Sequence, residues 1–473
     1  MVQIGVCLKC LSSASSVSST GSLASSQLHA SQTSTHDDTP LLTRNQKRKR
    51  RDKERGKQKM KKVKAEKNKQ GSNDRNDPSI RSYMYKRHVQ GVEAVVAEGY
   101  ALDVEAPVCS TGYICRDDQV TYHHPFWLHE LVGPSSRFKM REIKWNGKYA
   151  THSCAVKPRL AHQSIYSNRR RPIPILNEDG RVIALLAGRP RSCHWRKIMH
   201  EAANLLEILR GQCNFFNSKG PNRRGDFGAL NVGISFGGGQ VVVLDQLLVS
   251  KPFRFMSGFS NSELALPPKF EVIVKRDIKV CRLGVFKTWQ PDLHGHYRDT
   301  MRVLVENDKR LSLPFANSVF ACAAFNFGPQ TVCVDHLDHS NFPPGWCGIW
   351  SLGSFNPKRG GHLVLQDLGI VVRFPPGSLI LVPSASCRHE NAKIAEGETR
   401  YSFTQFSAGG LFRWVEHGCQ SETNYGKALA KMSEEERAAQ VTRDKRRWLD
   451  GLSLVSLAKD LGIKVPQAAA HTS

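Results

Sequence analysis

The segment from Trp195 to Arg210 carries its apolar residues at helical spacing, so that they would share one stripe of a helix. These residues are Trp195, Ile198, Ala202, Leu205, Leu206 and Leu209. A stripe of this kind predicts an amphipathic helix that packs against a sheet. The run from Pro174 to Leu186 has another pattern, in which two short apolar stretches flank Asp179-Gly180. Asp-Gly between two such stretches predicts a β-hairpin.

Beyond Phe270 the apolar runs are short and Pro- and Gly-rich breaks separate them, which predicts a strongly β region. The candidate strands are Phe320 to Val334, Gly348 to Phe355, His362 to Leu368, Ile370 to Phe374, Ser378 to Val382 and Arg400 to Ser407. Short, evenly spaced strands are typical of a double-stranded β-helix, the jelly-roll or cupin-like fold. The expected fold class is therefore α+β, with a β-helix core and flanking helices.

Composition divides the chain into four segments. Residues 1–80 are Ser-rich and then basic, with almost no aromatic residues, so this tail is expected to be disordered. Residues 81–165 are globular in composition, and we assign them no chemistry. Residues 166–420 hold the predicted β-helix. Residues 421–473 form a helical tail in which Ser433 and Glu436 have the spacing of a capping box.

The charge of the chain is strongly positive, at +26 from 68 basic and 42 acidic residues. The run from Arg44 to Gln70 alone contains fifteen Lys or Arg against three acidic residues. Such a run predicts a nuclear import signal or a nucleic-acid arm, while a solvated tail with no specific partner is an equally good interpretation. Thirteen scattered cysteines indicate reduced thiols inside a cell, and no apolar run is long enough to span a membrane.

Candidate chemistry centres on the pair His336 and Asp338, at the end of an extended run. Side chains two residues apart in a strand point the same way, so that an imidazole and a carboxylate can bind one metal ion together. His389 follows another candidate strand and can complete a facial triad that leaves positions open. Arg400 and Ser402 come next, and a guanidinium there can bind a carboxylate at two points. This order is what a site for non-haem Fe(II) and 2-oxoglutarate requires.

A long ordered set of motifs supports that interpretation. They are A-G-R-P (Ala187 to Pro190), F-N-F-G-P, H-L-D-H-S-N, G-W-C, G-G-H-L-V-L, F-P-P-G-S, P-S-A, the His389 region and R-Y-S-F-T-Q-F-S-A-G-G-L-F-R-W-V. Over roughly Arg171 to Gly418 the chain thereby resembles the TET/JBP-like 2-oxoglutarate dioxygenases, in particular the branch expanded in basidiomycete fungi. The resemblance makes residues 166–420 the dioxygenase domain.

The resemblance implies a role for each matching residue. His336, Asp338 and His389 would bind Fe(II), and Arg400 with Ser402 would anchor the cosubstrate 2-oxoglutarate. Two more residues match positions that meet a flipped base, Asn341 by hydrogen bonding and Phe406 by stacking. The sequence departs from the common family pattern at three places, where it has Leu337 in the middle of the H-x-D pair, Phe406 for a frequent Tyr, and Ala408 where animal members have a His.

The leading hypothesis is an Fe(II)- and 2-oxoglutarate-dependent dioxygenase that uses O2 to oxidise 5-methylcytosine in DNA, to 5-hydroxymethylcytosine and further. A methyl group in stacked duplex DNA cannot approach a buried metal, so the methylated base has to be flipped out. Basic residues that could neutralise phosphates around the pocket are Arg169, Arg170, Arg171, Arg189, Arg191, Arg223, Arg224, Lys358 and Arg359.

Two alternatives stay open at this point. The first keeps the iron chemistry but acts on N6-methyladenine, RNA or a protein side chain. The second is a catalytically silent DNA-binding protein associated with chromatin or transposons. The basic run favours a nuclear location in each case.

Overall fold

The computed structural model of the 473-residue chain describes residues 85, 88–100, 108–109, 112–113, 122–147, 172–189, 194–212, 224–236, 244–245, 279–315 and 318–465. The chain divides into two compact units, Met1–Asn73 and Asp74–Ser473, and every described residue belongs to the second. The predicted disordered tail, with its basic run, lies outside the described residues.

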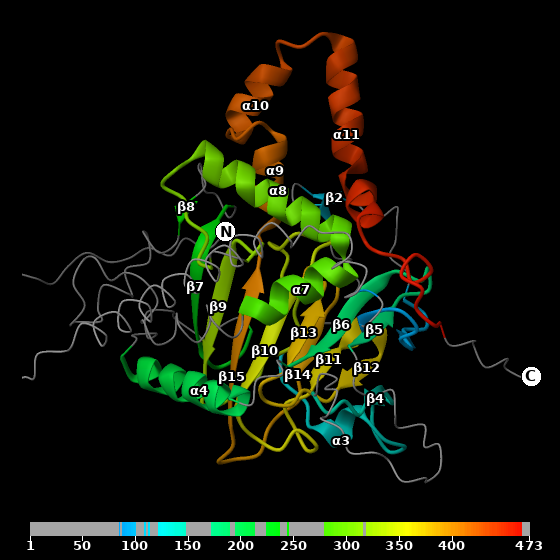
Figure 1. Ribbon diagram of the computed structural model, residues 1–473, viewed down its shortest axis with the longest axis vertical. Helices are drawn as coiled ribbons and strands as arrows, with labels where there is room; N and C mark the ends of the chain where they lie inside the picture. Colours follow the sequence, from blue (N-terminus) through cyan, green and yellow to red (C-terminus); the bar gives the residue numbers. More distant parts are fainter. Residues whose placement is uncertain are drawn as a thin grey trace, which may run out of the picture. The chain divides into compact units, whose positions relative to one another are not determined.

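Two large elements of the fold are a nine-stranded sheet and a four-stranded sheet (Figure 1). The larger sheet has the order β1-β5-β6-β13-β10-β15-β9-β7-β8, and the smaller has the order β14-β11-β12-β4. Strands of the larger sheet are β1 (Val95–Val96), β5 (Ile173–Leu176), β6 (Val182–Gly188), β7 (Gly228–Ser235), β8 (Leu244–Asp245), β9 (Cys322–Phe327), β10 (Cys347–Ser354), β13 (Leu379–Val382) and β15 (Thr399–Phe406). Those of the smaller are β4 (Arg141–Ile143), β11 (Leu363–Leu365), β12 (Ile370–Val372) and β14 (His389–Asn391). A separate hairpin joins β2 (Val108–Cys109) to β3 (Gly112–Tyr113).

From β9 onward the chain alternates between the two sheets. It passes from β9 in the larger sheet to a bridge between His336 and His389 beside the smaller one, and then back to β10. Strands β11 and β12 lie in the smaller sheet, β13 in the larger, β14 in the smaller and β15 in the larger. This alternation is the strand succession of a jelly-roll. The strand order of the described residues therefore agrees with the predicted α+β class and its β-helix core.

Side chains that alternate along the strands pack in three layers, one between the two sheets and one on the outer face of each sheet. On β10, Ile349 faces the smaller sheet, whereas Trp350 faces the helices on the other side. On β11, Leu363 and Leu365 face the larger sheet, whereas Val364 packs outward against the segment that contains Phe126 and Leu131. Each sheet thus buries both of its faces, which explains why its strands read as nearly continuous apolar runs.

Helices cover the outer face of the larger sheet (Figure 1). The predicted amphipathic helix is α4 (Trp195–Gln212), and its first residue, Trp195, donates to the Gly377 carbonyl and lies 5.2 Å from the ring of Trp350. The other helices are α3 (Leu128–Leu131), α7 (Lys279–Trp289), α8 (Pro291–Asn307), α9 (Gly409–Glu416), α10 (Glu422–Leu429) and α11 (Glu434–Ser453), with a 3-10 turn η5 (Gln366–Leu368) after β11. None of the described helices is both long and apolar enough to cross a membrane.

The prediction of strong β structure beyond Phe270 is wrong for residues 279–307, where α7 and α8 form. Leu293, Tyr297, Met301 and Leu304 are buried on α8, at the helical spacing that identifies a packed face. This signal was present in the sequence. Phe286 of α7 stacks on Phe320 and Trp346, which come shortly before β9 and β10, and Tyr297 of α8 packs edge-on against Phe320.

Two predicted strands are shorter in the structure than in the sequence analysis. The strand expected over Phe320 to Val334 is β9 only as far as Phe327, because Pro329 has no N–H to donate to a neighbouring strand. The strand expected over His362 to Leu368 ends at Leu365 and continues as the turn η5. Both changes shorten a strand where the chain turns toward the other sheet.

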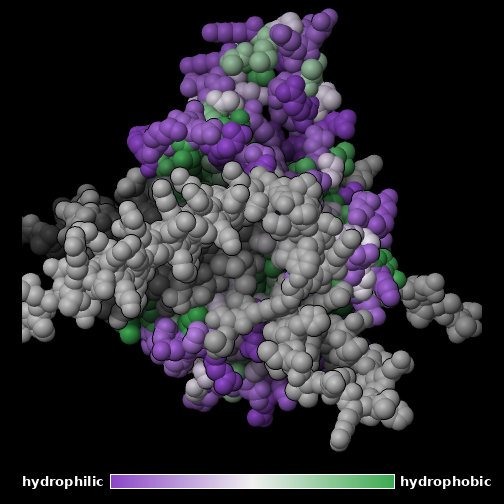
Figure 2. Space-filling view, viewed as in Figure 1, coloured by the Kyte–Doolittle hydropathy of each residue, from purple (hydrophilic) through white to green (hydrophobic). Residues whose placement is uncertain are grey.

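Segments outside the β-helix extend both sheets. Strand β1 pairs with β5 in the larger sheet, and β4 pairs with β12 in the smaller, so residues 81–165 add a strand to each. At the other end of the chain, Ser433 and Glu436 form the predicted capping box at the start of α11. The surface over α10 and α11 is largely hydrophilic, as expected for a peripheral element (Figure 2).

Candidate metal centre and cosubstrate pocket

All seven residues singled out in the sequence line one cavity of about 50 Å³ between the two sheets. They are His336, Asp338, Asn341, His389, Arg400, Ser402 and Phe406. Their elements differ, since one histidine begins β14, the arginine, serine and phenylalanine lie on β15, and the rest follow β9 without being in a strand. The location of the seven side chains follows from the fold, and their roles stay predictions.

His336, Asp338 and His389 bring their ligand atoms to within 4.8 Å of one another. His336 Nε2 lies 3.8 Å from Asp338 Oδ1, and His389 Nε2 lies 4.0 Å from Asp338 Oδ2. Ligand atoms at right angles on a metal with bonds of about 2.1 Å are about 3 Å apart. The three side chains therefore have the composition of a facial triad and need to close by about an ångström around an ion.

The backbone holds this triad from both sides. His336 and His389 form a two-way bridge, in which each backbone N–H donates to the other residue's carbonyl at 3.2 and 3.1 Å. Asp338 N–H donates to the Ser384 carbonyl at 2.8 Å. Asp338 is thus placed by the turn before β14 rather than by the strand geometry that the sequence suggested.

Both imidazoles are oriented by carbonyl groups. His336 Nδ1 lies 2.8 Å from the Val334 carbonyl, and His389 Nδ1 lies 3.0 Å from the Cys387 carbonyl. A carbonyl can only accept, so each Nδ1 carries a proton, and each Nε2 is the ring nitrogen nearer to Asp338. These are the second hydrogen bonds that metal-binding histidines characteristically make.

The charge states in the cavity suit a cation. Burial, together with the nearby His389 and Arg224, lowers the pKa of His336 to about 3, so this imidazole is neutral at pH 7. Burial would raise the pKa of Asp338, but Arg224 and the two imidazoles outweigh it and lower the pKa below its ordinary value. One carboxylate and two imidazoles are the donor set that Fe(II) accepts in oxygenases.

Arg400 is a buried cation in the wall of the same cavity. It is 1% exposed, and among the described residues no carboxylate pairs with it. Its Nη1 donates to the Thr331 carbonyl, while its Nε has no hydrogen-bond partner. Burial lowers the pKa of Arg400 to about 10, which measures the cost of this unpaired charge. A buried charge of this kind fits an anionic ligand.

Ser402 lies on the same face of β15 as Arg400 and beside the cavity. Its hydroxyl accepts from Asn326 Nδ2 at 2.8 Å, which orients the hydroxyl hydrogen away from that amide. The guanidinium and the hydroxyl therefore present donors to one region of the cavity. A carboxylate group fits that arrangement.

Asn341 and Phe406 lie near the triad. Asn341 Nδ2 donates to Ser384 Oγ at 3.0 Å and to Asp338 Oδ2 at 3.4 Å. The Ser384 hydroxyl also hydrogen bonds to Asp338 and helps to lower the pKa of that carboxyl group. The ring of Phe406 is half-buried at the end of β15, against the core between the sheets. Ser384 was not singled out in the sequence, where nothing marks it within P-S-A-S.

Arg224 occupies a place that the sequence analysis did not foresee. It was grouped with possible phosphate contacts, but its Nη2 lies 2.5 Å from Asp338 Oδ1. A metal ion bound here would share this carboxylate with Arg224. Of the other basic residues in that group, Lys358 and Arg359 are exposed between β10 and β11, and Arg189 is half-buried. Arg169, Arg170, Arg171, Arg191 and Arg223 lie outside the described residues.

Comparison with known proteins adds little to these observations. No family model and no curated protein matches the sequence. Among solved structures, the chain is similar to NgTET1 in complex with 5mC DNA, with a TM-score of 0.34 and 16% sequence identity. The alignment covers 51% of this chain and 78% of the NgTET1 chain. At that level of similarity, function has to be inferred from the residues of the cavity.

Proposed function

We propose that the protein is an Fe(II)- and 2-oxoglutarate-dependent dioxygenase that oxidises 5-methylcytosine in DNA. The observation that carries the proposal is a single cavity in which a His, Asp, His set with correctly oriented imidazoles lies beside an unpaired, buried guanidinium. The first group of residues suits a ferrous ion, and the second suits a dicarboxylate.

His336, Asp338 and His389 are the residues that hold the metal in this proposal. Bound Fe(II), with 2-oxoglutarate and O2, supplies the oxidation of an inert methyl C–H bond, one oxygen atom going to the methyl group and the other to succinate, with release of CO2. Arg400 neutralises the far carboxylate of 2-oxoglutarate, and Ser402 donates to it.

The amide of Asn341 supports cytosine over thymine as the target base. Asp338 can only accept a hydrogen bond, so Nδ2 of the amide has to face it. The amide oxygen is then the group that remains for a ligand in the cavity. It can accept from the exocyclic amine of 5-methylcytosine but not from the carbonyl at the same position of thymine. Phe406 offers a ring against which the flipped base stacks.

The alternatives predict different products. A dioxygenase for N6-methyladenine would use the same amide oxygen, because adenine also carries an exocyclic amine. A dioxygenase for RNA or a protein side chain would release succinate without a modified DNA base. A silent DNA-binding protein would have no use for the buried Arg400, whose cost in stability favours an active site.

Mass spectrometry of nucleosides tests the proposal. The purified protein is incubated with Fe(II), 2-oxoglutarate and duplex oligonucleotides that carry 5-methylcytosine, N6-methyladenine or only thymine. We expect 5-hydroxymethylcytosine from the first duplex, none from a His336→Ala variant, and normal yield from His294→Gln, which changes a buried histidine on α8 that does not line the cavity. Product only from the adenine duplex, or succinate without any modified base, would contradict the substrate assignment.

The nuclear location is a separate part of the proposal. It rests on the basic run from Arg44 to Gln70, which is outside the described residues. Deletion of this run from a fluorescently tagged chain should move the protein from the nucleus to the cytoplasm. Retention of the nuclear signal after the deletion would contradict the assignment.

A further inference from the structure

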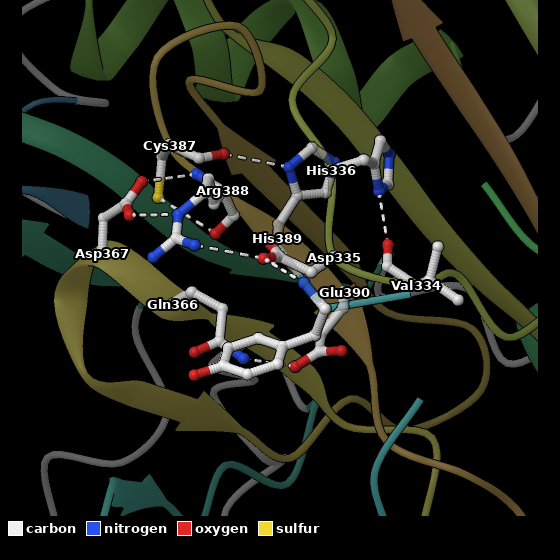
Figure 3. A network of polar contacts seen from close by, with 10 residues as sticks. Val334, Asp335, His336, Gln366, Asp367, Cys387, Arg388, His389 and Glu390 are labelled. Atoms are coloured by element: carbon white, nitrogen blue, oxygen red, sulfur yellow. Dashed lines mark hydrogen bonds and ion pairs between the residues drawn. The ribbon is translucent and has the colours of Figure 1, made fainter. Parts of the chain in front are cut away.

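The two histidines of the triad are each preceded by a charged residue. Asp335 comes before His336, and Arg388 comes before His389. Adjacent residues of an extended chain point to opposite sides, so these two charges lie on the face of the bridge that is turned away from the cavity. Figure 3 shows Arg388 between the carboxylates of Asp335 and Asp367, apart from the contacts of the two imidazoles.

Arg388 contacts both carboxylates through separate donors. Its Nη1 lies 3.2 Å from Asp335 Oδ2, and its Nε lies 2.8 Å from Asp367 Oδ1. Its backbone N–H also donates to Asp367 Oδ2, at 2.7 Å. The side chains are nearly or fully buried, with 15% of Arg388, 11% of Asp367 and none of Asp335 exposed. One guanidinium therefore connects the turn η5, the segment before His336 and the start of β14.

Part of the segment 81–165 covers this network. The backbone N–H of Tyr122 donates to Asp335 Oδ2 at 3.4 Å, and Phe126 packs on the same outer face of the smaller sheet. The network is thus shielded from solvent by a segment to which the sequence analysis assigned no chemistry. Ion pairs shielded in this way are weakly screened by salt and sensitive to the loss of a partner.

We propose that Arg388 is a positioning residue that fixes the separation of the two imidazoles. The backbone bridge between His336 and His389 is flanked by one hydrogen bond on each side, from Asn391 N–H to the Cys333 carbonyl at 2.9 Å and from Asp338 N–H to the Ser384 carbonyl at 2.8 Å. These backbone contacts fix the register of the two segments but not the spacing of the side chains behind the histidines. Arg388 adds a side-chain connection, on the face opposite the cavity, between the residues that precede the histidines. Without the guanidinium, Asp335 and Asp367 would be left as two buried carboxylates that repel each other across the gap. The segment that carries His336 would then move away from β14.

This inference rests on the proposed metal centre, and Co(II) binding tests both. Co(II) is titrated into the wild-type protein and into Arg388→Met, and its affinity and visible absorption spectrum are recorded without any substrate. Loss of a side chain that orients a metal ligand lowers metal affinity about 10- to 100-fold. We expect a loss in this range and a changed spectrum for Arg388→Met. Arg388→Lys should recover part of the affinity, because lysine provides a point charge that reaches one carboxylate at a time.

Arg373→Met is the matched control. Arg373 pairs with Glu142 at 2.9 Å in the same smaller sheet, with 19% and 12% of the side chains exposed, but it contacts neither segment that carries a histidine. We expect this variant to lose thermal stability and to keep wild-type Co(II) affinity and spectrum. Equal Co(II) binding by Arg388→Met and wild type would overturn the proposal and leave Arg388 with a purely structural role.

Two further outcomes keep the test decisive. If Arg388→Met does not fold, Asp335→Ala removes the contact between Arg388 and the His336 segment, together with the contact to Tyr122 N–H, and unchanged Co(II) affinity in that variant overturns the proposal. If the wild-type protein binds no Co(II), or His336→Ala binds it equally well, the metal centre itself is wrong and the proposed function fails with it. Failure of Arg388 alone, with a wild-type site that binds Co(II), leaves the proposed function intact.

Discussion

Replacement of Arg400 by methionine should make the ligand-free protein more stable. The guanidinium is 1% exposed and, among the described residues, has no carboxylate partner, so in the absence of ligand its charge is an unfavourable feature of the fold. Burial lowers the pKa of Arg400 to about 10 from an ordinary value of 12.5. At about 1.4 kcal/mol for each pKa unit, this difference corresponds to about 3 kcal/mol of stability.

One favourable contact is lost with the charge. Arg400 Nη1 donates to the Thr331 carbonyl, and removal of such a hydrogen bond costs about 1 kcal/mol. The net expectation is that Arg400→Met raises the free energy of unfolding by about 2 kcal/mol. Arg373→Met is the control, since Arg373 pairs with Glu142 and the same substitution should there lower stability by about 3 kcal/mol.

Urea unfolding with and without 2-oxoglutarate measures both parts of this prediction. With Mn(II) present and 2-oxoglutarate at a hundred times its dissociation constant, the wild-type protein should gain about 2.7 kcal/mol. Arg400→Met should gain nothing from 2-oxoglutarate, although it starts from a higher stability. A ligand-free Arg400→Met protein that is less stable than wild type would refute the claim that the buried charge of Arg400 destabilises the ligand-free fold. A variant that 2-oxoglutarate still stabilises would refute the role of Arg400 as the anchor.

Three other predictions concern the metal ligand, a helix end and pH. Ser384→Ala removes the hydroxyl that bonds to Asp338 and should weaken Mn(II) binding about 10-fold in a titration followed by electron paramagnetic resonance, while Ser386→Ala, whose hydroxyl donates to a backbone carbonyl, should not. Ser433→Ala should lower the free energy of unfolding by about 1 kcal/mol in urea, because it breaks the capping box of α11, and no change would show that α11 unfolds separately. Burial lowers the pKa of His294 to about 4, so the unfolded chain takes up this proton first and stability should fall as the pH drops from about 6.5 to about 4. His294→Gln should reduce that slope by up to about 1.4 kcal/mol per pH unit in unfolding measured across this range, and an unchanged slope would contradict the assignment.

Local patterns predicted those parts of the fold in which neighbours along the chain decide the structure. The helix that begins at Trp195, the hairpin around Asp179-Gly180 and the capping box at Ser433 all depend on residues a few positions apart. The same holds for β13, the strand that precedes His389, and for β15, the strand that carries Arg400. The helices α7 and α8 were missed although α8 has a clear apolar stripe, because the surrounding β pattern was extended over them.

The identity of the candidate metal ligands was also readable from the sequence, through the order of His336, Asp338 and His389. Their arrangement was not. Asp338 is placed by its backbone contact to Ser384, and Arg224 reaches it from the turn before β7, which is distant along the chain. These contacts depend on which strands become neighbours across the two sheets, and no periodicity within one segment encodes that choice.

The sequence by itself therefore indicated which side chains are candidates for binding a metal and an anion, and it predicted elements such as α4, β10 and β15, because residue chemistry and short-range periodicity suffice for both. Only the tertiary structure decided that the Arg400 guanidinium has no carboxylate partner among the described residues and that Arg388 connects the segments behind both histidines. The physical reason is that charge pairing in a buried site depends on the register between strands far apart in the chain. That register is set by the packing of the two sheets as a whole.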